Sequence, residues 1–151
     1  MERKDYVYLA GPMEDLSEEE MKGWRMELRE GLLTGWHQDP IQVLDPTRRV
    51  TFHDQLGDYL QDTTRSMNVC KRIFKQDMQD IANSRVVVAD IRRKMGKGTG
   101  TACEIMFAHM KNKIIILYSD PDDPIHPFLE SMATEKHYEL QDIIKAVRSY
   151  Y

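Results

Sequence analysis

Two short, wholly apolar runs constrain the fold of this chain more than any other feature of its sequence. Residues 86–89 are Val-Val-Val-Ala and residues 114–117 are Ile-Ile-Ile-Leu. Continuous apolar runs of this kind are typical of parallel strands that are covered on both faces. The sequence therefore predicts a sheet that lies between two layers of helices.

The rest of the chain alternates between strand patterns and helix patterns. Apolar runs at 7–10 and 41–44 are predicted strands, and a further short strand is expected near His137. Helical spacing of apolar residues occurs within 18–34, 68–84, 102–112 and 140–147. The polar segment 47–66 is predicted to be a long loop with room for a short helix. This alternation indicates a Rossmann-like α/β fold with a parallel sheet of four to five strands.

Composition limits the class of protein. The chain has 151 residues and a net charge of −4, from 21 Lys plus Arg against 25 Asp plus Glu. This length predicts one domain over residues 1–151, and the acidic balance argues against a nucleic-acid binder. Two cysteines cannot build a disulfide framework, and no apolar run is long enough for a signal peptide or a membrane span. We therefore expect a cytoplasmic protein with no membrane partner.

In a parallel α/β fold, ligands bind at the carboxyl ends of the strands. The loops after Ala10, Leu44, Ala89 and Leu117 should therefore converge on the site. One of them is basic and glycine-rich, from Arg92 to Gly100. It is not a Walker A loop, which would need a glycine where Ile91 stands. Free N–H groups at the start of the next helix would bind an anion, although a simply solvated loop fits the sequence equally well.

Two acids stand out by position. Asp77 lies on the apolar stripe of its helix, four residues from both Ile73 and Ile81, where an acid is costly unless it is paired or functional. Glu104 lies near the start of a helix at the expected ligand edge. Each also has a structural interpretation: Asp77 bonds a nearby backbone group, or Glu104 forms a capping box with Thr101. Two carboxyl groups in different surroundings are also the catalytic pair that cleaves a glycosidic bond, one as the acid and the other as the nucleophile.

The other candidate reactive groups are weaker. Cys103 adjoins Glu104, but no histidine stands at a spacing typical of a catalytic base. The five His and two Cys show no metal-ligand pattern. We expect no metal and no organic cofactor.

Three segments in this order resemble the nucleoside 2-deoxyribosyltransferase family, which includes the related deoxynucleoside 5′-monophosphate N-hydrolases. They are residues 6–12 (Tyr-Val-Tyr-Leu-Ala-Gly-Pro), the stretch from Asp77 through the strand 86–89, and residues 100–105 (Gly-Thr-Ala-Cys-Glu-Ile). The resemblance spans about residues 6–148. It implies a flavodoxin-like sheet of five parallel strands and a homodimer or larger homo-oligomer.

The resemblance also implies roles for individual residues. The glutamate of the family's G-T-A-x-E motif attacks C1′ of the deoxyribose, which makes Glu104 the nucleophile. Asp77 matches the acid that protonates the leaving base, and Tyr8 matches the tyrosine that hydrogen-bonds the nucleophile. By the same resemblance, residues in three places would bind the substrate: the turn after the first strand, the end of the third strand with the loop that follows it, and one later position. These residues are Gly11, Pro12, Met13, Asp90, Arg92, Gly98, Thr99, Gly100, Thr101 and His126.

One position departs from the nucleoside enzymes. They carry an acid six residues before the nucleophile, where this chain has Gly98. The monophosphate hydrolases also lack that acid. Loss of a negative charge beside Arg92, Arg93, Lys94 and Lys97 favours an anionic 5′-phosphate. His126 falls near the asparagine that nucleoside enzymes bring from a neighbouring subunit.

The expected function is cleavage of the N-glycosidic bond of 2′-deoxyribonucleosides or, slightly favoured, their 5′-monophosphates. The expected partners are the nucleoside or nucleotide and a purine or pyrimidine base, with transfer to another base or to water. A strict monophosphate N-hydrolase and a non-catalytic nucleotide-binding module remain the alternatives.

Overall fold

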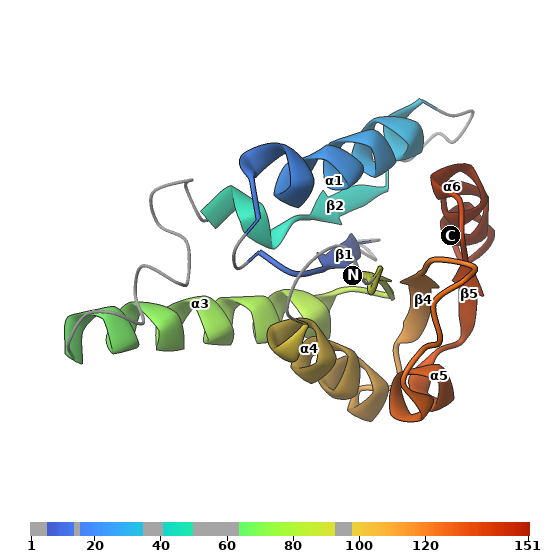
Figure 1. Ribbon diagram of the computed structural model, residues 1–151. Coiled ribbons are helices and arrows are strands. Elements are labelled where there is room, and N and C mark those ends of the chain that lie inside the picture. The colour runs from blue at the N-terminus through green and yellow to red at the C-terminus, as the bar shows by residue number, and fades with distance from the viewer. Residues whose placement is uncertain (1–5, 14–15, 35–40, 50–63, 93–97) are drawn as a thin grey trace.

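The computed structural model describes residues 6–13, 16–34, 41–49, 64–92 and 98–151. A five-stranded sheet lies at its centre (Figure 1). Its strands are β1 (Tyr6–Ala10), β2 (Gln42–Leu44), β3 (Val86–Asp90), β4 (Ile114–Tyr118) and β5 (Glu135–His137). They lie in the order β2-β1-β3-β4-β5, and every neighbouring pair is parallel. This confirms the predicted α/β fold, including the short strand near His137.

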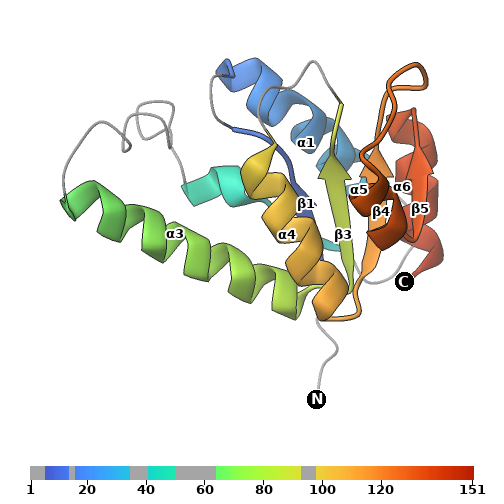
Figure 2. The same cartoon turned by 60° about the horizontal axis from the view of Figure 1, so that its bottom comes forward.

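The carboxyl ends of all five strands meet at one edge, and α4 starts there and runs back along β3 (Figure 2). The described helices are α1 (Glu18–Leu33), the 3₁₀ helix η1 (Pro46–Arg49), α3 (Thr64–Asn83), α4 (Thr99–Met110), α5 (Pro127–Met132) and α6 (Leu140–Ser149). None of them is both long and apolar enough to span a membrane.

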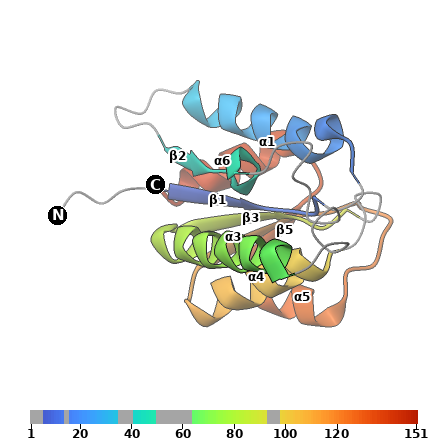
Figure 3. The same ribbon diagram turned by 90° about the vertical axis from the view of Figure 1, so that its left-hand side faces the viewer.

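The helices form the two predicted layers. Figure 3 shows α1 and α6 on one face of the sheet and α3, α4 and α5 on the other. The side chains of β1 divide between the layers: Val7 and Leu9 belong to the core under α1 and α6, and Tyr8 and Ala10 to the core under α3 and α4. Because successive side chains of a strand point to opposite faces, burial on both faces requires the continuous apolar runs that the sequence shows.

A capping box is present at the start of α1. Ser17 Oγ accepts a hydrogen bond from the Glu20 backbone N–H at 3.1 Å, and Glu20 Oε2 accepts one from the Ser17 N–H at 2.9 Å. Together they satisfy two N–H groups that have no partner within the helix. The helix ends at Leu33 with Thr34 as its C-cap.

Three boundaries differ from expectation. Helix α3 begins at Thr64, earlier than residue 68, and of the expected loop 47–66 the structure describes η1 and the first residues of α3. Helix α4 begins at Thr99 rather than near Ala102. Helix α5 was not predicted, because its six residues are too few to show a helical period. Its start is set by Pro127 and by the His126 ring, which accepts a hydrogen bond from the Phe128 N–H at 3.2 Å.

The contact between α1 and α6 predicts the effect of a methyl group at Gly31. A Cβ atom there would lie 2.3 Å from Ile144 Cδ1. We expect Gly31→Ala to lower the free energy of unfolding by about 1–3 kcal/mol through overpacking. Adding Ile144→Val, which removes the Cδ1 atom, should restore part of the lost free energy of unfolding, as measured by urea denaturation.

Gly23→Ala is the matched control, because it makes the same change in the same helix. Apart from its chain neighbours and the nearby helix backbone, no heavy atom of the described residues lies within 4 Å of a Cβ built at Gly23. Alanine should therefore stabilise the helix there by up to about 1 kcal/mol. Equal stability of the two variants would contradict the close packing of α1 on α6.

Candidate active site

A cavity of about 310 Å³ lies at the carboxyl edge of the sheet. The turn after β1, the side of α3 and the first turns of α4 form its walls. Its lining residues are Gly11, Pro12, Met13, Cys70, Ile73, Phe74, Asp77, Met78, Thr99, Gly100, Thr101, Cys103 and Glu104. Segments far apart in the sequence therefore bring most of the predicted site residues to one place.

Glu104 and Tyr8 are joined directly at this cavity. The Tyr8 hydroxyl donates a hydrogen bond of 3.1 Å to Glu104 Oε1. Tyr8 is wholly buried in the central strand β1, so its position is set by the sheet. Burial, followed by the charges of Glu104 and Asp77, raises the pKa of Tyr8 well above 10. The phenol therefore stays protonated and acts as a fixed donor to the carboxyl.

Asp77 reaches the same cavity from α3. Its side chain is buried, with 5% of the residue exposed, and it lies one helical turn from the buried Ile81. The apolar stripe of the helix thus carries Asp77 against the sheet, as the spacing predicts. Glu104 interacts electrostatically with Asp77, so two carboxyl groups share one partly apolar cavity.

The proton balance of this pair is set by its surroundings. The pKa of Glu104 is raised to about 8, chiefly by desolvation and next by the charge of Asp77. The hydrogen bond from Tyr8 and the positive charge of Arg25 lower this pKa. Desolvation is thus the main reason that Glu104 holds its proton more tightly than an exposed glutamate. Near neutral pH the ligand-free Glu104 therefore favours its protonated form.

Glu104 does not cap its helix. Because α4 starts at Thr99, Glu104 lies beyond the first turn, and Gly98 at the N-cap provides no side-chain hydrogen bond. Thr99, Gly100 and Thr101 nevertheless line the cavity. Among the described residues, the buried Thr101 Oγ1 atom has no hydrogen-bond partner, and only 4% of the residue is exposed. The free N–H groups at a helix N-terminus are a ready place for an anion.

Arg25 was not identified from the sequence. It lies on α1 four residues after Met21 and three before Leu28, on the buried stripe, and is itself wholly buried. The same reasoning that singled out Asp77, a charge on an apolar stripe, would have found it. Burial lowers the pKa of Arg25 overall, although the nearby carboxylates of Asp45, Glu104 and Asp90 act in the opposite direction.

Asp90 and Arg92 lie outside the lining of this cavity and bind each other. The Arg92 Nε and Nη2 atoms donate hydrogen bonds of 2.9 and 2.8 Å to the two carboxylate oxygens of Asp90, which is wholly buried. The guanidinium also lies 4.0 Å from the centre of the Tyr118 ring. Burial lowers the pKa of Arg92, but the hydrogen bonds and charge of Asp90 outweigh it and raise the pKa overall. Much of the positive charge of Arg92 is thus balanced inside the protein.

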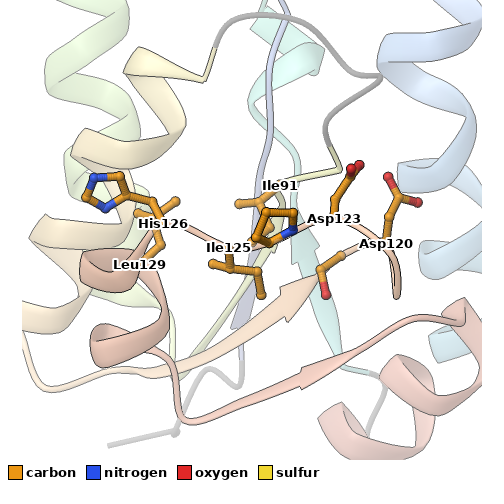
Figure 4. A pocket seen from close by; sticks show the side chains of 8 residues that line it. Ile91, Asp120, Asp123, Ile125, His126 and Leu129 are labelled. Carbon is orange, nitrogen blue, oxygen red and sulfur yellow. The ribbon is translucent and has the colours of Figure 1, made fainter.

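His126 lines a second cavity, of about 140 Å³, beyond the end of β4 (Figure 4). Its other lining residues are Ile91, Ser119, Asp120, Asp123, Pro124, Ile125 and Leu129. Within this copy of the chain, His126 is therefore not brought to the cavity of Glu104. Among the described residues, no group of three or more His, Cys, Asp or Glu side chains is placed to hold a metal ion.

The raised pKa of Glu104 predicts a pH-dependent effect of Glu104→Gln on stability. The folded-state pKa lies above the value of 4.5 in the unfolded chain. The folded protein therefore binds this proton more tightly, and its stability falls as pH rises from about 4.5 to 8. Glutamine cannot ionise, so the melting temperature of Glu104→Gln relative to the unmodified protein should increase steadily over this range.

Glu130→Gln serves as the control, because the Glu130 side chain is 47% exposed and contacts only Lys136 among the described ion pairs. Its effect on the melting temperature should be small at every pH. A Glu104→Gln difference that stays constant from about pH 5 to 8 would contradict the raised pKa.

Comparisons with solved structures agree with the fold. A 2-deoxyribosyltransferase from Bacillus psychrosaccharolyticus superposes with a TM-score of 0.66 at 19% identity, covering 92% of this chain and 90% of its own. The CMP N-glycosidase BcmB of Clostridium botulinum has a TM-score of 0.56 at 15% identity, covering 95% and 99%. A 2-desoxiribosyltransferase from Leishmania mexicana has a TM-score of 0.52 at 18% identity, covering 84% and 70%.

No protein-family model matches the chain, and no curated protein matches it in sequence. At these identities the structural likeness establishes the fold. The chain therefore has the α/β fold of 2-deoxyribosyltransferases and of a CMP N-glycosidase, as the sequence resemblance predicts.

Proposed function

We propose that this protein cleaves the N-glycosidic bond of 2′-deoxyribonucleosides or, preferentially, their 5′-monophosphates through a covalent glycosyl-Glu104 intermediate. The observation that carries the proposal is that Glu104 and Asp77 line one cavity, while the buried Tyr8 hydroxyl hydrogen-bonds Glu104 from the sheet beneath it. An attacking carboxyl, a second carboxyl able to carry a proton and a fixed hydrogen-bond donor are the groups that this reaction needs.

In the first half-reaction, a Glu104 carboxylate oxygen forms a bond to C1′ while the bond from C1′ to the base nitrogen breaks. The electron pair of that bond leaves with the base, and Asp77 transfers its proton to the base. The Tyr8 hydroxyl holds Glu104 in place at 3.1 Å. Orientation of this kind supplies a large part of the rate enhancement.

In the second half-reaction, water or the nitrogen of another base attacks C1′ from the opposite side. The ester bond breaks, Glu104 leaves as a carboxylate, and Asp77 takes the proton of the attacking group. The enzyme returns to its starting state with no cofactor consumed. Transfer and hydrolysis thus differ only in which acceptor enters the cavity.

The reaction requires Glu104 ionised and Asp77 protonated. In the ligand-free protein the pKa of Glu104, raised to about 8 by desolvation and by Asp77, opposes this distribution. Positive charge that develops on the sugar ring would favour the ionised Glu104 in the transition state, where it accelerates the reaction. Tyr8 and Arg25 act in the same direction.

The shape of the cavity suits a nucleobase on one side and an anion on the other. Apolar and thiol side chains of α3 and the turn after β1 line one wall: Met13, Cys70, Ile73, Phe74 and Met78. Thr99, Gly100 and Thr101, from the start of α4, also line the cavity. Because the N-cap residue Gly98 has no side chain to cap this helix, its N–H groups are suited to a 5′-phosphate.

The structural neighbours support both outcomes of the second step. Two are named 2-deoxyribosyltransferases and one a CMP N-glycosidase. The roles proposed for Asp90, Arg92 and His126 rest on the resemblance, and the basic residues Arg93, Lys94 and Lys97 lie outside the described residues. By the same resemblance, we propose that the protein is a homo-oligomer and that the segment around His126 serves the site of a neighbouring copy.

The test is incubation with the four deoxynucleosides and their four 5′-monophosphates, each with and without a free base, followed by mass spectrometry of the products. We expect free base from at least one substrate, with higher kcat/KM for a monophosphate. A new nucleoside or nucleotide on adding base shows transfer, and its absence shows strict hydrolysis. Glu104→Ala should lower kcat by at least about 10³-fold, whereas Glu130→Gln should leave it unchanged. Ligand binding without turnover would identify a non-catalytic binding module.

The phosphate preference makes a separate prediction for Thr101→Val, which removes one hydroxyl and keeps the side-chain shape. A hydrogen bond to a charged group contributes about 1.5–3 kcal/mol. The KM for a monophosphate should therefore rise about 10-fold or more, while the KM for the matching nucleoside stays within about twofold. An equal effect on both substrates would contradict an anion site at the start of α4.

A further inference from the structure

Arg25 is the only arginine that is fully buried among the described residues, and its contacts lead to the candidate active site. Its Nη2 atom donates a hydrogen bond of 3.1 Å to the Gly11 carbonyl, and its Nη1 atom donates one to the Met21 carbonyl. Its Nε atom lies 3.5 Å from Asp45 Oδ1, and its guanidinium lies 4.8 Å from the centre of the Trp24 ring. The side chain thus links α1 with the ends of β1 and β2.

Gly11 forms part of the cavity wall, so this hydrogen bond fixes backbone that a ligand would touch. The contact is close: a Cβ built on Gly11 would lie 3.0 Å from Arg25 Nη2 and 3.0 Å from Trp24 Cζ2. A side chain at position 11 would push the guanidinium or the Trp24 ring back by a few tenths of an ångström. Glycine therefore allows Arg25 its close approach to the turn.

The charge of Arg25 lies between several acids. Asp45 follows β2 and accepts hydrogen bonds from the Thr47 N–H and hydroxyl at 2.9 and 2.7 Å. Asp90, at the end of β3, is bound to Arg92. Tyr8 on β1 and Glu104 on α4 also interact electrostatically with the Arg25 guanidinium.

Glu104 thus has a cation on one side and an anion on the other. The charge of Arg25 and the hydrogen bond of Tyr8 lower its pKa, while desolvation and the charge of Asp77, on α3, raise it. In a buried site the attraction of one nearby charge shifts this balance by about 1–3 pKa units. Removing the positive charge would leave nothing but Tyr8 to favour the carboxylate among these groups.

We infer that Arg25 is a positioning residue of the active site: it holds the Gly11 turn in place through its hydrogen bond to the Gly11 carbonyl, and it places a buried positive charge beside the cavity that Glu104 lines. The inference rests on the proposed function for the role of Glu104 as nucleophile. A merely structural arginine would affect stability and leave the titration of Glu104 unchanged.

The test compares Arg25→Gln with Arg25→Lys. The first removes the charge, and the second keeps the charge but loses the paired donors to Gly11 and Met21. A third variant, Arg25→Met with Asp45→Asn, removes the buried charge of Arg25 together with that of its partly buried partner, so that neither is left unpaired. The control is Arg148→Gln: Arg148 also donates to two backbone carbonyls, of Gly31 at 2.5 Å and Thr34 at 2.8 Å, but its partners lie at the far end of α1.

The first measurement is independent of turnover. Carbon NMR of the glutamate carboxyl groups, with Glu104→Gln used to assign the signal, gives the pKa of Glu104 in each variant. We expect the pKa to rise by about 1 unit in Arg25→Gln and in the double variant. It should stay near its original value in Arg25→Lys and in Arg148→Gln.

The second measurement is the pH profile of kcat/KM on the best substrate. At about pH 6, Arg25→Gln should lose about 10-fold in kcat/KM and recover much of the loss at high pH, in proportion to the ionised fraction of Glu104. Arg25→Lys should raise KM with a smaller change in kcat, because the turn is no longer held.

An unchanged Glu104 pKa in both charge-removing variants would overturn the inference. So would an unchanged KM in Arg25→Lys together with an unchanged pH profile in Arg25→Gln. Failure of the proposed function looks different, because Glu104→Ala would then remain active while the NMR shift still occurred.

Discussion

The parallel pairing of β1 with β3 is the constraint on which the site depends. The register sets Tyr8 beside Val87 and Ala10 beside Ala89, so both strands end at the same level. The turn at Gly11 and the connection into α4 must then leave the sheet side by side. Since α4 packs against β3 and β1, Glu104 returns to the hydroxyl of Tyr8. The apolar strands thus supply the rigid frame that holds a polar site.

Two arginines, Arg92 and Arg25, offset part of the electrostatic repulsion and desolvation of the acids at this edge of the sheet. Asp77, Asp90 and Glu104 lie within partly or fully buried surroundings, where an unpaired charge is strongly unfavourable. Arg92 neutralises Asp90 through two hydrogen bonds, and Arg25 lies near Asp45 and acts on Glu104. These charges do not cancel the effect of burial on Glu104, whose pKa is raised to about 8. A perturbed carboxyl of this kind is typical of functional sites.

Much of this arrangement follows from the sequence, because the signals are local and periodic. The continuous runs at 86–89 and 114–117 predict the buried parallel strands, and the helical spacing around Asp77 predicts that it faces the sheet. Arg25 carries a signal of the same kind that was overlooked. Sequence patterns do not predict the pairing of Arg92 with Asp90 or the separate cavity of His126, because both depend on tertiary contacts. They also do not predict helix α5, because it has too few residues to show a helical period.

The central claim is that Glu104 forms a bond to the sugar, and intact-protein mass spectrometry tests it most directly. The protein is mixed with its best substrate, stopped with acid within milliseconds to seconds, and digested to locate any added mass. The account predicts one added deoxyribosyl group, with its phosphate where the substrate is a monophosphate, on the peptide that contains Glu104. The adduct should be absent in Glu104→Gln and should disappear when substrate is exhausted. Turnover by Glu104→Gln at the rate of the unmodified protein, with no adduct in either, would contradict the account.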